Sequence, residues 1–317
     1  MPIVNTSVPI TAESCNAAIA ALVQAYPFCR SELLVTTAFQ RPIRTLVIGN
    51  GPRKVIYSAS HHANEWITSL VLLKFAEELA EAIQSGQTLG GQDARQLSQT
   101  ATIYMVPMVN PDGVDLVTGA IQSGNIQYDL AQRLAQDYPT ISFPEGWKAN
   151  LLGVDLNLNY PAGWLQAREI KFSQGFTTPG PRDYVGRAPL NQLETRVLAD
   201  YTEFIDPALV LAYHSQGQEI FWNFQDYEVP GARELGEQFA AVSGYTLTEP
   251  AFNSSFAGYK DWFIQQFRRP GYTIEVGRGQ NPLPLSQFDE IYRDNLGILL
   301  LAATGGNTPT LPEDMPE

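Results

Sequence analysis

Two kinds of hydrophobic pattern alternate along the chain. Short runs rich in Val, Ile, Leu, Thr and Tyr predict strands, and longer stretches with apolar residues every three or four positions predict amphipathic helices. The predicted strands cover residues 31–38, 44–49, 54–59, 102–106, 209–214 and 272–276, and the predicted helices cover residues 12–25, 65–85, 191–205, 230–243, 259–267 and 285–303. Strands that alternate with helices indicate one α/β domain with a mostly parallel sheet.

Two segments lack such periodicity. Residues 86–99, GQTLGGQDARQLSQ, predict a polar surface loop. Residues 107–189 are rich in Asn, Gly, Pro and aromatic residues, and long irregular segments inside a compact domain are often functional. The Gly-, Pro- and acid-rich end predicts a flexible tail over residues 305–317, which follows one domain over residues 1–304.

Charge restricts the expected partners. Lys and Arg total 20 against 33 Asp and Glu, which gives a formal net charge of -13. Such a chain repels the phosphates of nucleic acids and anionic lipid headgroups, so we expect neither a nucleic acid nor a membrane as a partner. The N-terminal residues have neither the basic start nor the apolar run of a secretory signal, so the chain as written is expected to be cytoplasmic.

The two cysteines are not expected to pair. A helix over residues 12–25 would hold the Cα atoms of Cys15 and Cys29 well beyond the ~7 Å limit for a disulfide. We therefore expect two free thiols in small buried positions.

All three histidines lie at predicted strand ends. His61 and His62 follow one strand, and Glu65 comes three residues after His62, where the first helical turn returns it to the same side. His61 is one residue out of register with this pair. His214 ends another strand and can bring a second imidazole to the same sheet edge. Two His and one Glu plus water form a catalytic zinc set, although each feature alone also fits an ordinary structural role.

Five motifs together carry a family resemblance. They are HANEWIT (62–68), NPDG (110–113), GVDLNLN (153–159), AYHS (212–215) and GYTIEVG (271–277). Their order and spacing resemble the zinc carboxypeptidase family, the carboxypeptidase A-like metallopeptidases, over about residues 11–303. The resemblance implies a carboxypeptidase-like α/β fold, with a mixed, mostly parallel twisted sheet of about eight strands and helices on both faces.

The resemblance also implies roles for site residues. It makes His62, Glu65 and His214 the ligands of one Zn²⁺ per chain, and Glu275 the catalytic carboxylate. It makes Asp155 the acceptor of the free ring N–H of the first zinc-binding histidine, which fixes the tautomer of that ring. The alternative interpretation of Asp155 is an Asx-turn residue.

Glu275 also has a physical argument of its own. It lies in an apolar strand, where an unpaired carboxylate is costly to bury, so a nearby cation is expected. Zinc would supply that charge, and a glutamate beside a zinc-activated water can act as general base and then protonate the leaving amine. The alternative, a surface glutamate at a strand end, is disfavoured because both flanks are apolar.

The chain departs from the family at both of its substrate-binding arginines. The residue after Asn157 is Leu158, where members that trim free C-termini have an arginine that binds the terminal carboxylate. Asn157 itself is expected to bind substrate. Upstream, leucines stand where the family has an arginine for the oxyanion, and Lys148 is the cation that could replace it. The alternative for Lys148 is a solvated surface lysine.

Pocket positions depart from the family as well. The residue that forms the pocket bottom in the family lies fifteen residues before the catalytic glutamate, which is Lys260 here (275 − 260 = 15). A lysine at this place implies an anionic group on the substrate, because it would otherwise be a buried, unpaired charge. Asn253 stands where digestive members have a mobile tyrosine.

The runs NPDGVDLV, GYKDWF and EVGRGQNPLP resemble a bacterial branch of the family that hydrolyses the γ-D-glutamyl to diaminopimelate bond of peptidoglycan stem peptides. We therefore predict a monomeric zinc peptidase that acts on muropeptides with several carboxylates. The alternatives are a general metallocarboxypeptidase that prefers anionic side chains and a pseudoenzyme that keeps the metal and binds muropeptides. Cell-wall association is expected instead if a leader or wall-binding module has been removed.

Overall fold

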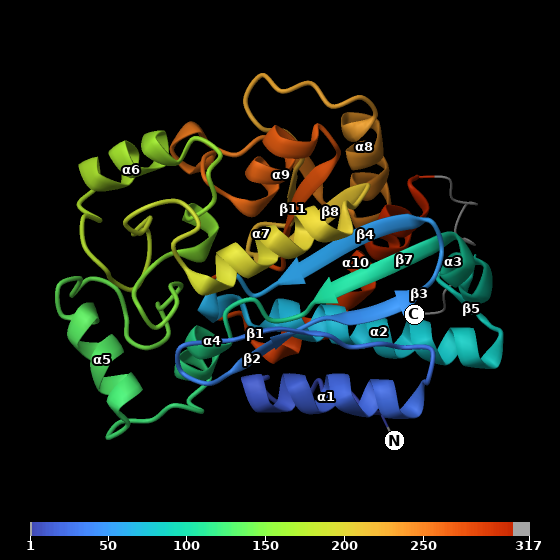
Figure 1. Cartoon of the computed structure of the whole chain (residues 1–317), viewed down its shortest axis with the longest axis horizontal. Coiled ribbons are helices and arrows are strands. Elements are labelled where there is room, and N and C mark those ends of the chain that lie inside the picture. Colours follow the sequence, from blue (N-terminus) through green and yellow to red (C-terminus); the bar gives the residue numbers. More distant parts are fainter. Residues whose placement is uncertain (1, 307–317) are drawn as a thin grey trace.

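The computed structural model describes residues 2–306 and has a mixed α/β fold (Figure 1). Within this range the main sheet has seven strands rather than about eight, in the spatial order β10 (Thr246–Thr248), β9 (Glu219–Phe221), β11 (Gly271–Val276), β8 (Leu209–Ser215), β4 (Arg53–Ala59), β7 (Ala101–Val106) and β3 (Leu46–Gly49). The pairs β9–β11 and β3–β7 are antiparallel, and the other neighbours are parallel. The mixed, mostly parallel sheet is thus confirmed.

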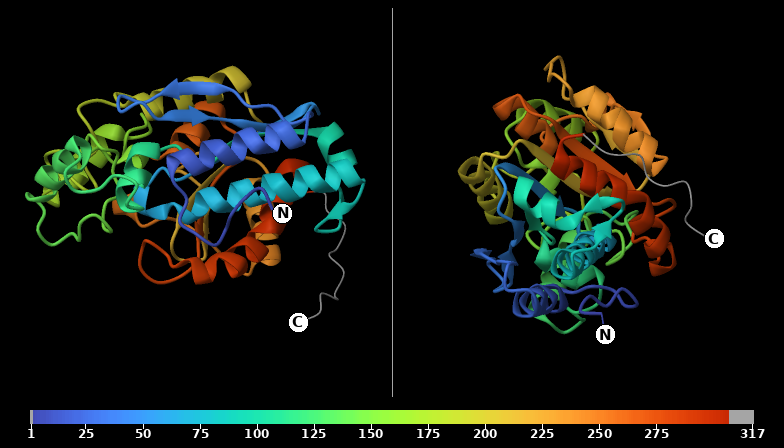
Figure 2. Two further views of the ribbon diagram at one scale, coloured as in Figure 1. Left: turned by 90° about the horizontal axis from the view of Figure 1, so that it is seen from below. Right: turned by 90° about the vertical axis from the view of Figure 1, so that its right-hand side faces the viewer.

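Helices cover both faces of this sheet, as the sequence predicts. One face packs against α1 (Ala12–Ala25), α2 (Ile67–Ser85), α3 (Ala94–Thr100), α8 (Ala232–Ser243) and α10 (Phe288–Thr304). The other packs against α7 (Leu193–Ile205) and α9 (Tyr259–Phe267), whereas α6 (Trp164–Ser173) lies beyond the carboxyl edge of the sheet. Figure 2 shows the two layers from other directions. The strand predicted over residues 31–38 forms as β1 (Leu33–Thr36), which pairs with β2 (Pro42–Arg44) in a separate sheet.

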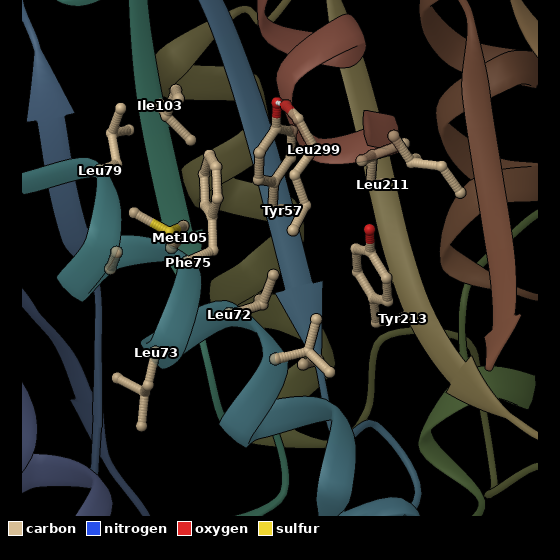
Figure 3. Packing of buried hydrophobic residues seen from close by; sticks show 14 of the residues in the cluster. Tyr57, Leu72, Leu73, Phe75, Leu79, Ile103, Met105, Leu211, Tyr213 and Leu299 are labelled. Carbon is tan, nitrogen blue, oxygen red and sulfur yellow. Dashed lines mark hydrogen bonds between the residues drawn. The ribbon is translucent and has the colours of Figure 1, made fainter. Parts of the chain in front are cut away.

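The core on the α2 and α10 side explains why these helices form where they do. Phe75 of α2 packs against Tyr57 of β4 with ring centroids 6.3 Å apart (Figure 3). The Tyr57 hydroxyl donates to the Leu299 carbonyl of α10 at 2.7 Å, which satisfies a phenol that is otherwise fully buried. The apolar stripe of residues 65–85 is therefore core, and α2 ends where Gly86 takes the left-handed conformation (φ 71°).

Two expectations about irregular segments are wrong. The predicted loop 86–99 contains the hairpin of β5 (Thr88–Leu89) and β6 (Gln92–Asp93) and most of α3, which Asp93 caps. The segment 107–189 contains α4 (Pro111–Val117) and α5 (Ile126–Ala135) as well as α6. In Figure 1 this green segment lies beyond the arrowheads of β4 and β7, so it covers the carboxyl edge of the sheet.

The remaining expectations concern the cysteines and the chain end. Cys15 and Cys29 are both free and buried, as predicted, and burial raises the pKa of each thiol to about 12. Except for Gly305 and Gly306, the predicted tail lies outside the described residues. Within residues 2–306, every helix is too short or too polar to cross a bilayer.

Candidate active site

Three neighbouring parallel strands bring the predicted site residues to one edge of the sheet. β8 and β11 pair in a register that sets Glu275 beside His214. Ala59, the last residue of β4, pairs with Tyr213, so the turn that carries His62 leaves the sheet next to His214. The carboxyl ends of parallel strands are a common location for active sites in open α/β sheets.

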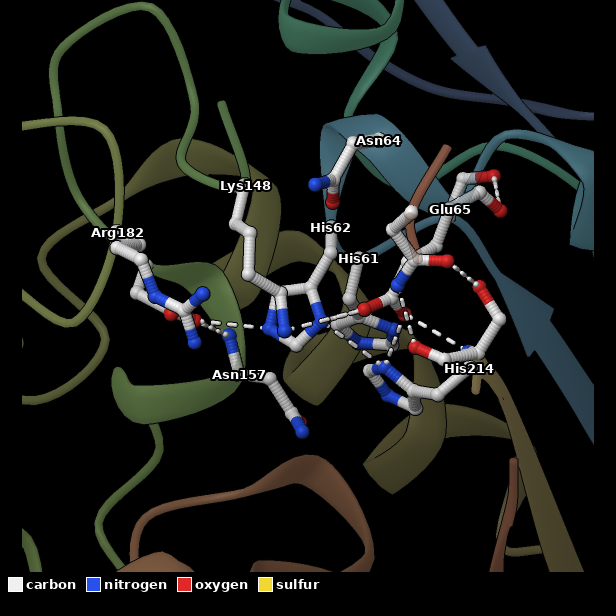
Figure 4. A network of polar contacts seen from close by, with 12 residues as sticks. His61, His62, Asn64, Glu65, Lys148, Asn157, Arg182 and His214 are labelled. Atoms are coloured by element: carbon white, nitrogen blue, oxygen red, sulfur yellow. Dashed lines mark hydrogen bonds and ion pairs between the residues drawn. The ribbon is translucent and has the colours of Figure 1, made fainter. Parts of the chain in front are cut away.

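The donor atoms of His62, Glu65 and His214 converge on one point (Figure 4). The Nδ1 atoms of the two histidines are 3.1 Å apart, and each lies 2.9 Å from one oxygen of Glu65. A 3₁₀ turn over Ala63–Glu65 returns Glu65 to the side of His62, and the Ser215 backbone N–H donates to Glu65 at 3.2 Å. All three side chains are buried, and their potential ligand atoms lie within 4.8 Å of one another.

The electrostatics of this cluster favour a cation. Burial alone lowers the pKa of His62, but the negative charges of Glu65 and Asp155 and the hydrogen bond to Asp155 together raise that pKa to about 9. The Glu65 pKa is held well below its usual range, mainly by His62 and Lys148, although burial opposes this. A buried carboxylate with two imidazole nitrogens therefore attracts positive charge, and this donor set suits zinc.

Asp155 has both of the roles considered for it from the sequence: it accepts a hydrogen bond from a histidine of the cluster, and it caps a turn. Its Oδ1 accepts from His62 Nε2 at 3.0 Å, which leaves Nδ1 facing Glu65. The same oxygen accepts the backbone N–H of Asn157 at 3.2 Å and caps the 3₁₀ turn Leu156–Leu158. Burial tends to raise the Asp155 pKa, but the charge and hydrogen bond of His62 lower it below its usual range. Asp155 is therefore an ionised acceptor that orients the His62 ring.

Lys148 and Glu275 lie beside the cluster. The Lys148 Nζ is 3.2 Å from Glu65 Oε1 and its side chain is 18% exposed, so it is not the solvated surface lysine of the alternative interpretation. Desolvation and then the charge of Glu65 raise the pKa of Glu275 to about 8, while Lys148 and His62 act in the opposite direction.

Two cavities meet at these residues. The first, of about 600 Å³, reaches from His62 and Glu275 to Lys260, and the second, of about 640 Å³, reaches toward Asn64 and Asn281. Both are lined by Lys148, Arg182, Glu219, Phe221 and Glu275. Glu275 thus stands where the two cavities join.

Lys260 lines the first cavity, but the expectation that it is an unpaired charge is wrong. Its Nζ lies 2.6 Å from Asp261 Oδ1 and also donates to the Asn223 carbonyl. Asp261 in turn accepts the Gly258 N–H with its other oxygen and caps the start of α9. The lysine is therefore a buried half of an ion pair at the cavity wall.

The other predicted substrate residues differ in position. Asn157 lines the first cavity, where its side-chain oxygen accepts the Tyr259 N–H, and Leu158 lies beside it. Asn253 is exposed on a 3₁₀ turn and is not among the residues that line either cavity. His61 stays outside the metal cluster: its Nε2 contacts the Tyr160 hydroxyl at 3.2 Å, and its ring stacks on His214.

Three residues at the site were not predicted from the sequence. Arg182 and Asp183 come from the irregular segment, and Lys171 lies in the last turn of α6; all three line the first cavity. Lys171 and Arg182 each approach a different oxygen of Asp183 at 2.6 Å. The one signal for them in the sequence is a charged pair, Arg182-Asp183, within a Gly- and Pro-rich run.

Comparisons with known proteins agree with this geometry. The model of a family described as zinc carboxypeptidase matches residues 15–297. The chain is 43% identical to gamma-D-glutamyl-L-diamino acid endopeptidase 1 of Lysinibacillus sphaericus, over 87% of this chain and 67% of that protein. It is 36% identical to protein YqgT of Bacillus subtilis, over 88% and 73%. The structure of bovine thrombin-activatable fibrinolysis inhibitor has a similar fold, with a TM-score of 0.71 at 17% identity, over 95% of this chain and 98% of that one.

Proposed function

Because this chain belongs to the zinc carboxypeptidase family and is a metallopeptidase, we propose that it hydrolyses the bond between γ-D-glutamate and a diamino acid, diaminopimelate, in peptidoglycan stem peptides. The catalytic part rests on the convergence of His62, Glu65 and His214 next to Glu275, at the junction of two cavities. The substrate part is supported by the name of the 43% identical relative and by the mixed lining of the first cavity, in which lysine and arginine side chains stand beside carboxylates, as a substrate with both amino and carboxylate groups requires.

His62, Glu65 and His214 would hold one zinc ion per chain, since two imidazole nitrogens and a carboxylate leave a ligand position open. When bound, zinc lowers the pKa of water and polarises a carbonyl group. Asp155 keeps the His62 ring in the orientation that presents Nδ1, because a carboxylate can only accept the N–H of Nε2.

Glu275 would take the proton from the attacking water and deliver it to the leaving amine. It lines both cavities, so it can reach the scissile bond of a peptide that spans them. Lys148 also lines both cavities and carries a positive charge close to Glu65, so it is the protein group that we assign to the developing oxyanion.

The first cavity would hold the diamino acid. Lys260 can bind a carboxylate there, while Glu219 and Glu249 in the same cavity can bind an amino group. Leu158 occupies the place of the family's terminal-carboxylate arginine, and leucine offers no hydrogen bonds to a carboxylate. Lys260 is therefore the cation that we assign to a carboxylate of the diamino acid in this cavity.

The test is incubation of the purified, zinc-loaded protein with defined stem peptides and with ordinary peptides, with the products identified by mass. We expect L-alanyl-γ-D-glutamate and free diamino acid from the tripeptide, and their formation at a rate lower by about 10²–10⁴-fold with the Glu275→Gln protein. Loss of single C-terminal residues from ordinary peptides would instead indicate a general metallocarboxypeptidase. Binding of stem peptides without any product would indicate a pseudoenzyme.

A further inference from the structure

Arg182 is the arginine that lines both cavities. It lies with Lys148 and Glu275 at their junction, and its side chain is 42% exposed, so a ligand can reach it. Figure 4 shows Arg182 next to Lys148, Asn157 and the His62 ring. Arg182 lies outside the five motifs that carry the family resemblance, in the segment 107–189.

Asp183 fixes the position of Arg182. The Arg182 Nε donates to Asp183 Oδ2 at 2.6 Å, and Lys171 Nζ holds the other oxygen at the same distance. The backbone N–H of Asp183 donates to Asp155 Oδ2 at 3.2 Å. Because Asp155 also holds His62, the guanidinium group is anchored to the same carboxylate that orients the candidate metal site.

The outer part of the guanidinium group remains available. Among residues 2–306, no protein group accepts a hydrogen bond from the two terminal nitrogens of Arg182, and the one bond it makes uses Nε. These two nitrogens form a planar fork that matches a carboxylate. The Nε side of the Arg182 guanidinium group is therefore bound to Asp183, and its two terminal nitrogens are available to a carboxylate at the junction of the two cavities.

The chemistry of a γ-glutamyl bond calls for such a group. A γ-linkage leaves the α-carboxylate of the glutamyl residue free, and the α carbon and the β and γ methylene groups separate it from the scissile carbonyl. This carboxylate lies on the acyl side of the bond, opposite the diamino acid. Lys260 lines only the first cavity, so the junction with the second cavity is where the α-carboxylate would come.

We propose that the terminal nitrogens of Arg182 bind this free α-carboxylate and make Arg182 a specificity residue for γ-linked peptides. The inference rests on the proposed function, because it assumes a γ-glutamyl substrate. It adds a protein group for the free carboxylate on the acyl side of the bond. An ordinary α-linked peptide has a carboxylate at this distance from the scissile carbonyl only when its acyl-side residue is glutamate.

The test compares the tripeptide L-alanyl-γ-D-glutamyl-diaminopimelate with its form amidated at the glutamyl α-carboxylate. Wild type should prefer the acid by about 10- to 100-fold in kcat/KM, as expected for a hydrogen bond to a charged group. Arg182→Gln should reduce this preference to about threefold or less. Arg187→Gln is the matched control, since Arg187 is exposed further along the same segment, and it should behave as wild type.

Binding provides a second readout that does not need turnover. In the Glu275→Gln protein, calorimetry should give tighter binding of the acid than of the amide, and adding Arg182→Gln should remove the difference. Equal preference in wild type and Arg182→Gln, or equal binding of acid and amide, would overturn the inference while leaving the proposed function intact. If wild type cleaves neither peptide, the proposed function fails, and the binding comparison still decides the role of Arg182. Should Arg182→Gln not fold, Arg182→Lys replaces it and should lose most of the preference, because lysine lacks the planar fork.

Discussion

Replacement of Lys260 by methionine is expected to affect stability as well as substrate preference. Lys260 and Asp261 are each 4% exposed, and the Lys260 Nζ lies 2.6 Å from Asp261 Oδ1. Methionine would fill much of the same space but leave the Asp261 carboxylate without its cation. The variant therefore measures the contribution of the ion pair to stability separately from its contribution to substrate recognition.

The size of the effect follows from this arrangement. Loss of one partner of a buried ion pair typically costs about 3–5 kcal/mol, because the other charge stays buried. Here Asp261 still accepts the hydrogen bond from the Gly258 N–H and lines a cavity. We therefore expect Lys260→Met to lower the free energy of unfolding by about 2–4 kcal/mol. Urea unfolding followed by circular dichroism would measure the free energy of unfolding. The double variant Lys260→Met/Asp261→Asn should recover at least half of the loss, because no charge remains unpaired.

The same variants address substrate recognition. Amidation of the diaminopimelate carboxylate that enters the first cavity should cost the wild-type enzyme about 1.5–3 kcal/mol in kcat/KM. The double variant should be nearly indifferent to that amidation, since it has no charge left at this place. Lys260→Met should accept the amide at least as well as the acid, because the Asp261 carboxylate stays there without its cation. If Lys260→Met unfolds at the same urea concentration as wild type and prefers the acid over the amide as strongly as wild type does, the reasoning about Lys260 is refuted.

Three further substitutions test the remaining parts of the site and fold. Glu275→Gln should fold and bind zinc but lose about 10²–10⁴-fold in kcat, and near-normal turnover would remove Glu275 from the mechanism. Asp155→Asn should weaken zinc binding about 10–100-fold in chelator competition, because His62 loses its charged acceptor; an unchanged Kd would argue against that role. Burial raises the pKa of the Glu194 carboxyl group from its usual value of about 4.5 to about 7. The contribution of this group to stability is therefore fully present below pH 4.5, where it is protonated, and is lost as the pH rises through 7. Glu194→Gln should therefore be more stable than wild type by about 3 kcal/mol at pH 8 and by much less at pH 5, and urea unfolding that gave the same difference at both would contradict this.

The fold was predictable where hydrophobic patterns are long. The helices α1 and α9 begin and end at the predicted residues, and the buried strands β4, β8 and β11 lie within one residue of their predicted ends. The strands β9 and β10 have three residues each, too few for a pattern to emerge. The helix α4 begins in NPDG, a sequence typical of a turn, because Asn110 accepts the Gly113 N–H as a cap and Pro111 fits the first turn.

The site was predictable where sequence spacing determines geometry. His62 and Glu65 are three residues apart in a tight turn, and His214 and Glu275 end adjacent strands. The pairing of Lys260 with Asp261 was not predictable, since neighbours in a helix do not normally face each other. Arg182 reaches the site through a backbone hydrogen bond between Asp183 and Asp155, a contact between irregular segments that leaves no periodic trace in the sequence.

The central claim is that His62, Glu65 and His214 hold one zinc ion. The most direct measurement is zinc content by mass spectrometry together with the zinc Kd from chelator competition. Wild type should carry one zinc per chain and His214→Ala should lose it, whereas His61→Phe should retain it, because His61 stacks on His214 but directs its Nε2 to Tyr160. One zinc per chain in His214→Ala, bound as tightly as in wild type, would contradict the assignment.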